Sequence, residues 1–111
     1  MNPRLRLADG IEPVGARMAD LALLWCELLD GLDTDDLIRT EFTHDDGGTI
    51  TAHFMDVQPV IAWAEALGGL AFVREHIAGR TYRVTAAGPI TRNGRTALVR
   101  LRANETDRSV A

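Results

Sequence analysis

The sequence predicts one small α+β domain, with a four-stranded antiparallel sheet built from two hairpins and two main helices packed on one face of it. Two stretches alternate apolar and polar residues around glycine-containing turns, which is typical of β-hairpins. Each follows a stretch whose apolar residues recur every three or four positions, which is typical of an amphipathic helix. The 111 residues suit a single domain, so the predicted order is αββαββ over residues 1–111.

The first helix is predicted over residues 13–30. Pro13 suits the first helical position, and Gly31 can end the helix. Leu24 and Leu29 widen the apolar face beyond what one small sheet is expected to cover, so we predict that they form a homodimer interface. The stripe itself consists of Val14, Met18, Leu21, Trp25, Leu28 and Leu32.

The first hairpin is predicted from residues 37–42 and 50–55, where β-branched and aromatic residues alternate with polar ones. A two-residue turn at Asp46-Gly47 would mix apolar and polar residues on both faces. A three-residue loop at residues 45–47, with Gly47 in the left-handed conformation, keeps the apolar residues on one face, and we predict this loop. Its register sets Phe42 opposite Ile50 and Ile38 opposite Phe54.

The second helix is predicted to begin after Asp56, whose carboxylate can accept the amide hydrogens of the first turn. Pro59 lies within that turn, where a missing amide hydrogen costs little. Gly68-Gly69 is predicted to end the helix. Residues 70–78 are ambiguous, but a short helix fits the spacing of Leu70, Val73 and Ile77.

Tyr82 to Ala103 form the second predicted hairpin, because Asn93-Gly94 is a strong signal for a two-residue turn. Pro89 lacks an amide hydrogen and favours an edge position. The chain from Asn104 onward is predicted to be frayed, as are residues 1–10. The turn sets Ile90 opposite Ala97, Ala86 opposite Leu101 and Val84 opposite Ala103.

The composition is that of an ordinary globular protein, with 46% hydrophobic and 25% charged residues. The single cysteine excludes an internal disulfide, and no signal peptide or membrane-spanning run is visible, so we expect a cytoplasmic protein with no membrane partner. All twelve basic residues are arginine and alanine is abundant. Both residues can use GC-rich codons, which suggests a GC-rich bacterial genome.

Charge is divided unevenly along the chain. Residues 1–56 carry four arginines and twelve acidic residues, whereas residues 57–111 carry eight arginines and four acidic residues. Such asymmetry indicates a charged partner or a self-complementary assembly, although the two halves of one fold can also neutralise each other.

The arginines of the second hairpin are the candidate contacts for a partner or for phosphate, because guanidinium groups pair with phosphates and carboxylates. A solvated polar face is the alternative. These candidates are Arg83, Arg100 and Arg102, which should share one face, and Arg92 and Arg95, which flank the turn. If both hairpins join one sheet, Arg83, Arg100 and Arg102 share a surface with Arg39, Glu41, Thr51, His53, Thr85 and Leu98. Opposed arginine faces repel, so this surface is not expected to form the centre of a symmetric dimer.

The sequence contains no motif that places a catalytic residue, a metal or a cofactor, so we expect none of these. Cys26 lies next to the apolar stripe and is expected to be a packed free thiol. The acidic run at residues 30–36 lacks the spacing of a calcium loop. Trp25 and Trp63 are expected in the core. The spacing of zinc ligands is likewise missing from His44, His53 and His76.

These features predict a small non-catalytic protein-interaction module that is homodimeric and acts as an adaptor or regulator. The alternative is a regulatory protein that binds nucleic acid through the arginine-rich second hairpin. A small enzyme is the third hypothesis, and a pocket holding His53 with Arg39 or Glu41 would favour it.

Overall fold

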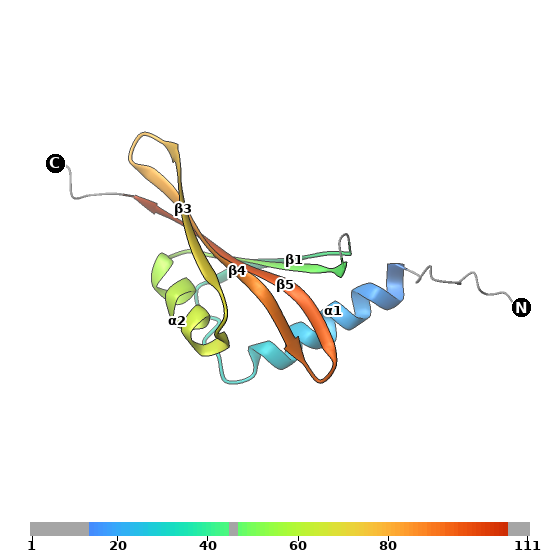
Figure 1. Cartoon of the computed structure of the whole chain (residues 1–111). Coiled ribbons are helices and arrows are strands. Elements are labelled where there is room, and N and C mark those ends of the chain that lie inside the picture. Colours follow the sequence, from blue (N-terminus) through green and yellow to red (C-terminus); the bar gives the residue numbers. More distant parts are fainter. Residues whose placement is uncertain (1–13, 45–46, 107–111) are drawn as a thin grey trace, which may run out of the picture.

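Two helices and five strands make up the structure, a computed structural model that describes residues 14–44 and 47–106 (Figure 1). The α+β class is as predicted. Along the chain the elements are α1 (Val14–Leu29), β1 (Leu37–Thr43), β2 (Thr49–Phe54), α2 (Val57–Leu67), β3 (Ala71–Ala78), β4 (Thr81–Arg92) and β5 (Arg95–Thr106).

The five strands form one mixed sheet in the order β1-β2-β5-β4-β3. The two predicted hairpins are present, but they meet through a parallel pairing of β2 with β5, whereas every other neighbouring pair is antiparallel. The predicted four-stranded antiparallel sheet is therefore wrong. The extra strand β3 is the cause, because it adds one reversal of direction between the two hairpins.

The predicted short helix at residues 70–78 is also wrong, because this segment is the strand β3. Its spacing fits a helix and its residue types fit a strand, since Phe72, Val73 and Ile77 are aromatic or β-branched. Pairing with the long strand β4 decides between the two, from Ala71 opposite Ala87 to Ala78 opposite Thr81.

The register of the first hairpin is confirmed where Phe42 lies opposite Ile50. The predicted pairing of Ile38 with Phe54 is wrong, because a bulge sets Leu37 opposite Phe54 instead. Ile38 is consequently 60% exposed rather than part of the inner face. Gly47 has the positive φ that the predicted loop requires, and the rest of that loop, Asp45-Asp46, lies outside the described residues.

The second hairpin follows the predicted register at all three predicted pairs. Asn93 and Gly94 both have positive φ, as a two-residue turn of this kind requires. Pro89 lies beyond the residues of β4 that pair with β3, so β4 is locally an edge there. The expectation of fraying from Asn104 is wrong for the residues up to Thr106, which continue β5.

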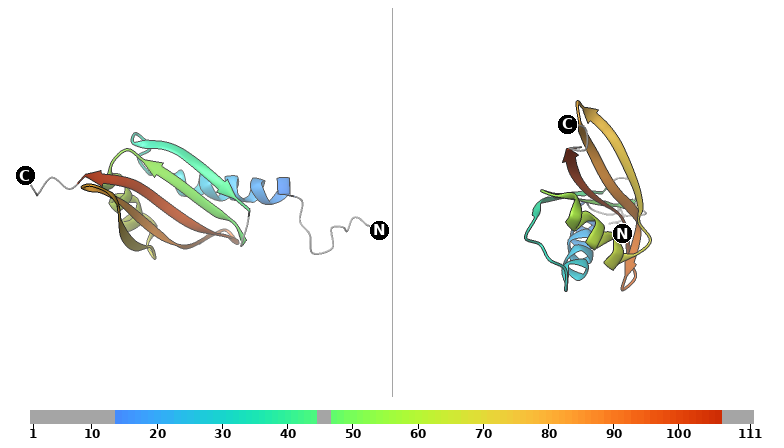
Figure 2. Two further views of the ribbon diagram at one scale, coloured as in Figure 1. Left: turned by 90° about the horizontal axis from the view of Figure 1, so that it is seen from above. Right: turned by 90° about the vertical axis from the view of Figure 1, so that its left-hand side faces the viewer.

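Both helices pack on one face of the sheet, and the other face is left open (Figure 2). The predicted start of α2 is confirmed, since the Asp56 carboxylate accepts a hydrogen bond from the Val57 amide at 2.7 Å. Trp25 and Trp63 lie in the core as predicted, with ring centroids 5.4 Å apart. The Trp63 indole N–H donates to the Asp33 carbonyl oxygen at 2.9 Å, which satisfies its polar atom and ties the α1–β1 connection to α2.

Three side chains of α1 differ from expectation. Leu24 is 0% exposed and lies in the core, so it is not on a surface where it could form the predicted dimer interface. Leu29 is partly buried against the same core, and the exposed leucine of this helix is Leu23. The expected packed thiol of Cys26 is wrong, because Cys26 is exposed. The sheet therefore covers the wide apolar face of α1 more completely than its size suggested.

Candidate functional site

The sheet face turned away from the helices, which we call the open face, collects charged residues from several strands. The strand registers arrange its side chains in rows across the sheet, and one row runs through Arg39, His53, Arg102, Thr85 and Val73. Neighbouring strands lie about 4.8 Å apart, so the backbones of Arg39 and Arg102 are separated by about 10 Å. Residues 63 positions apart in the sequence thereby become neighbours.

The next row of the open face runs through Glu41, Thr51, Arg100, Ala87 and Ala71. Thr51 is only 6% exposed although no described helix covers it. The two rows contain most of the surface predicted from the sequence, and its other two residues, Arg83 and Leu98, lie in the rows on either side.

A cavity of about 250 Å³ opens on this face, at the end where β1 begins and β2 ends. Its lining includes three arginines from three different strands and a histidine from a fourth. We call it the arginine pocket, and it is lined by Ile38, Arg39, His53, Phe54, Arg83, Arg102, Ala103 and Asn104.

Arg102 occupies the middle of this arrangement, between His53 on β2 and Thr85 on β4. Its side chain is half-buried, and its Nε is buried without a hydrogen-bond partner within residues 14–44 and 47–106. A buried N–H that makes no hydrogen bond costs free energy, and guanidinium donors are satisfied best by carboxylate or phosphate oxygens. The pocket therefore contains an unsatisfied donor, and an anionic group would satisfy it once a shift of the Arg102 side chain exposes this atom.

Glu41 links two of the other basic groups beside the pocket. Its Oε1 lies 3.2 Å from His53 Nε2, and its Oε2 lies 3.4 Å from an Nη of Arg39. The hydrogen bond with His53 is the main cause that holds the pKa of Glu41 below its ordinary value. Partial desolvation opposes this shift, and the charges of Arg39, His53 and Arg102 add to it.

The remaining basic groups of the open face are Arg83 and Arg100. Arg83 lies opposite Asn104 on one side and opposite Glu75 on the other. Arg100 lies opposite Thr51 in the row next to the pocket and does not line it. The open face therefore carries four arginines, counting Arg39 and Arg102, but only two carboxylates, Glu41 and Glu75. It retains a net positive charge.

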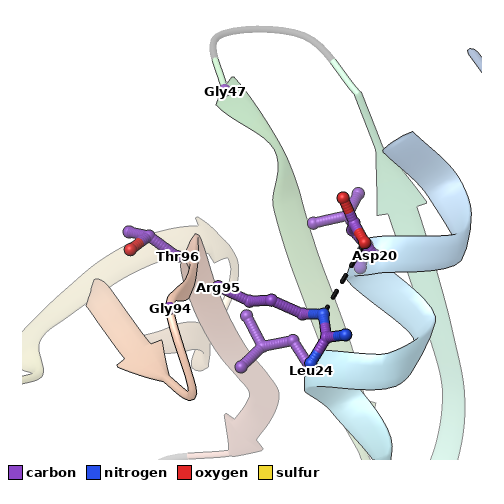
Figure 3. A pocket seen from close by; sticks show the side chains of 7 residues that line it. Asp20, Leu24, Gly47, Gly94, Arg95 and Thr96 are labelled. Carbon is purple, nitrogen blue, oxygen red and sulfur yellow. Dashed lines mark ion pairs between the residues drawn. The ribbon is translucent and has the colours of Figure 1, made fainter. Parts of the chain in front are cut away.

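Arg92 and Arg95, the other two candidate contacts, lie apart from these arginines and flank the turn of the second hairpin, as predicted. They lie opposite each other at the β4–β5 turn, and Arg95 reaches toward α1, where its Nε lies 3.6 Å from an Asp20 oxygen (Figure 3). An Nη of Arg95 also lies 3.5 Å from Glu27 Oε1, and Glu27 Oε2 accepts a hydrogen bond from the Asn93 side chain. These contacts neutralise Arg95 and attach the turn to the helix.

A second cavity, of about 220 Å³, lies beside this contact and is lined in part by Asp20, Leu24 and Arg95 (Figure 3). It differs from the arginine pocket because its one guanidinium already faces two carboxylates. The predicted arginine set thus separates into Arg83, Arg100 and Arg102 on the open face and two residues at the turn.

Sequence reasoning left out Arg39 and His53 as site residues, although it placed them on the surface that both hairpins share. The sequence does not reveal which strand lies beside β2 on the side away from β1. A parallel pairing with β5 sets His53 directly opposite Arg102, and no local signal in either hairpin predicts that pairing.

Within the described ranges, no group of three or more histidine, cysteine or acidic side chains could hold a metal ion. Neither described helix combines the length and apolarity needed to cross a bilayer. Comparison of the chain with protein-family models, with curated proteins and with solved structures gives no match. The chemistry of the arginine pocket is consequently the best guide to function.

Proposed function

We propose that this protein is a small non-catalytic interaction module that binds an acidic group of a partner protein in the arginine pocket. The observation that carries the proposal is the buried, unpartnered Nε of Arg102 in a cavity also lined by Arg39, Arg83 and His53. Guanidinium groups bind carboxylates through charge-assisted hydrogen bonds, which are stronger than neutral ones.

The size of the pocket favours a single acidic group over a whole cofactor. Small-molecule sites usually enclose about 300–1,000 Å³. The arginine pocket encloses about 250 Å³ and is open to one face, so it suits one carboxylate or phosphate presented by a larger molecule. An acidic side chain on a protein surface has this form.

The alternative of nucleic-acid binding receives less support from the same face. The rows of the open face carry no phenylalanine, tyrosine or tryptophan among the described residues, so bases have no ring on which to stack. The net charge of −4 opposes non-specific attraction to a phosphate backbone. Two of the five predicted arginines, Arg92 and Arg95, also lie at the β4–β5 turn and not on the open face.

The enzyme hypothesis gains one feature, because His53 does line a pocket together with Arg39 and is hydrogen-bonded to Glu41. A histidine and a carboxylate can form the base and orienting group of a catalytic pair, but a nucleophile is also needed. Cys26, the chain's single cysteine, lies on α1 behind the sheet, and cysteine, serine and lysine are all missing from the lining of the pocket. Binding is the function that the arrangement supports best.

The test is to titrate the protein with a hexaglutamate peptide at low salt and to follow the arginine Nε–H signals by NMR. We expect the Arg102 signal to shift and Arg102→Ala to weaken binding about tenfold or more. A hydrogen bond to a charged group contributes about 1.5–3 kcal/mol, and about 1.4 kcal/mol is tenfold. Arg92→Ala is the matched control, because it removes the same charge outside the pocket.

Two results would overturn the proposal. Equal weakening by Arg92→Ala and Arg102→Ala would mean that only net charge matters. Tighter binding of a single-stranded oligonucleotide than of the peptide, with a steep dependence on salt, would favour the nucleic-acid alternative.

A further inference from the structure

An exposed apolar side chain lies at the mouth of the arginine pocket. The apolar residues in its lining are Ile38, Phe54 and Ala103. Phe54 and Ala103 are buried in the core, whereas Ile38 is 60% exposed. Ile38 is therefore the apolar group of the pocket that a ligand can contact.

The bulge at the start of β1 is the cause of this exposure. Regular alternation would place Ile38 on the helix-covered face, where it was predicted. The bulge instead sets Leu37 opposite Phe54 and Arg39 opposite His53, which leaves Ile38 without a partner residue on β2. Leu37 packs against the core in its place. Bulges often re-aim a side chain beside a functional site, and this one turns an isoleucine toward a cavity lined by three arginines.

Met55 extends the apolar surface at this end of the first hairpin. Its amide donates to the Asp36 carbonyl oxygen at 2.9 Å, which continues the contact between the two chain segments beyond β1 and β2. The Met55 side chain is 71% exposed and lines a neighbouring cavity that shares Asn104 with the arginine pocket. Apolar surface therefore borders the pocket as well as lining it.

We propose that Ile38 selects the ligand of the arginine pocket, and that the acidic group belongs to an extended segment of a partner protein with an apolar side chain two residues away. The inference rests on the proposed function and adds the chemistry that surrounds the acidic group. Charge complementarity calls for the acidic residue, because three arginines line the pocket. The exposed isoleucine calls for its apolar companion, because contact between two apolar side chains removes surface from water.

The spacing of the two ligand residues follows from the sheet. Ile38 lies on β1 and Arg102 on β5, two strand spacings apart, which is about 10 Å between backbones. Both side chains line the same cavity. On an extended segment, side chains two residues apart point the same way and lie about 7 Å apart, whereas adjacent side chains point to opposite sides. A separation of two residues is therefore the shortest that lets one extended segment contact both side chains.

Blocked peptides test this selection in the NMR titration of the arginine Nε–H signals. Leu-Gly-Glu-Gly-Leu carries leucine two residues from glutamate in both chain directions, and Ala-Gly-Glu-Gly-Ala has no leucine. We expect the leucine peptide to bind about fourfold more tightly, the effect of removing roughly one CH₂ group from water. Gly-Leu-Glu-Leu-Gly has the same composition with leucine next to glutamate, and we expect it to bind no more tightly than the alanine peptide.

A substitution of Ile38 tests whether this residue causes the preference. Ile38→Thr keeps a β-branched residue in the strand but removes apolar surface, and we expect it to reduce the leucine preference to less than twofold. Val73→Thr is the matched control, because Val73 is 56% exposed on the same open face and lies outside the lining of the pocket. A preference that survives Ile38→Thr, or that is lost equally in Val73→Thr, would overturn the selection by Ile38.

The same titration distinguishes failure of this inference from failure of the proposed function. Equal binding of all three peptides, with the Arg102 signal shifted by each, would overturn the selection and leave the acidic site in place. If no peptide shifts that signal, the proposed function is wrong and the selection with it. Hexanoate joins a carboxylate to an apolar chain without a peptide. Ile38-dependent binding of hexanoate as tight as that of the leucine peptide would assign the pocket to a free carboxylic acid and overturn the protein segment as its ligand.

Discussion

Replacement of Leu24 by alanine tests whether this residue lies in the core of the domain or at an interface with another chain. Leu24 is 0% exposed and is among the largest fully buried side chains, whereas its neighbour Leu23 is 50% exposed. Leucine-to-alanine changes in a core cost about 2.7–5 kcal/mol, because apolar contacts are lost and a cavity remains. We therefore expect Leu24→Ala to lower the free energy of unfolding by about 3 kcal/mol and Leu23→Ala to lower it by about 0.5 kcal/mol or less.

Urea denaturation followed by tryptophan fluorescence measures the difference, since Trp25 and Trp63 lie in the same core. For a small domain the slope is about 1–3 kcal/mol per M, so Leu24→Ala should lower the midpoint by about 1–3 M. The loss should be the same at every protein concentration. If the two variants lose equal stability, or if the effect of Leu24→Ala disappears on dilution, Leu24 acts at an interface and its position in the fold is wrong.

Two further predictions concern stability. Gly88→Ala should lower the free energy of unfolding by about 1–3 kcal/mol in urea denaturation, because a Cβ there would lie 2.5 Å from the Gly69 carbonyl oxygen. Gly94→Ala is the control, because Gly94 has a positive φ but open space around it, so this variant measures backbone strain without a clash. Because the pKa of Glu41 is lowered in the folded state, its ionised form stabilises the fold at pH values above the ordinary carboxyl pKa. This contribution is lost as the pH falls through the lower pKa of the folded state. Glu41→Gln should therefore reduce the pH dependence of the urea midpoint in the acidic range. An unchanged acidic profile in Glu41→Gln would show that the contact with His53 has no effect on stability.

The sequence predicted the local elements well because their signals are local. Asn93-Gly94 determines the second hairpin, since few other residues adopt positive φ at two successive positions. Asp56 determines the start of α2 for a similar reason, as its carboxylate bonds the next amide. Even the register of the first hairpin around Phe42 followed from keeping apolar residues on one face.

Most of the wrong predictions concern contacts between distant segments. Residues 70–78 have the apolar spacing of a helix but residue types that favour a strand, and the free side of β4 decides between the two. The exposure of Leu24 depended on how much of α1 the sheet covers, which no single helix reveals. The arginine pocket was predicted only in part. Its basic residues were assigned to one face of the sheet, but the pairing of His53 with Arg102 depends on a contact between distant strands that the sequence did not reveal.

The parallel contact between β2 and β5 also has a consequence for folding kinetics. The three antiparallel pairs of consecutive strands close short loops, whereas Thr49 pairs with Leu98 across almost half of the chain. Closing a longer loop costs more entropy, so we expect the hairpins to form early and the docking of β2 on β5 to limit the rate. Arg39 and His53 reach Arg102 only in that last step. A ligand of the pocket would then slow unfolding without accelerating folding, because it binds a surface that the transition state has not yet assembled.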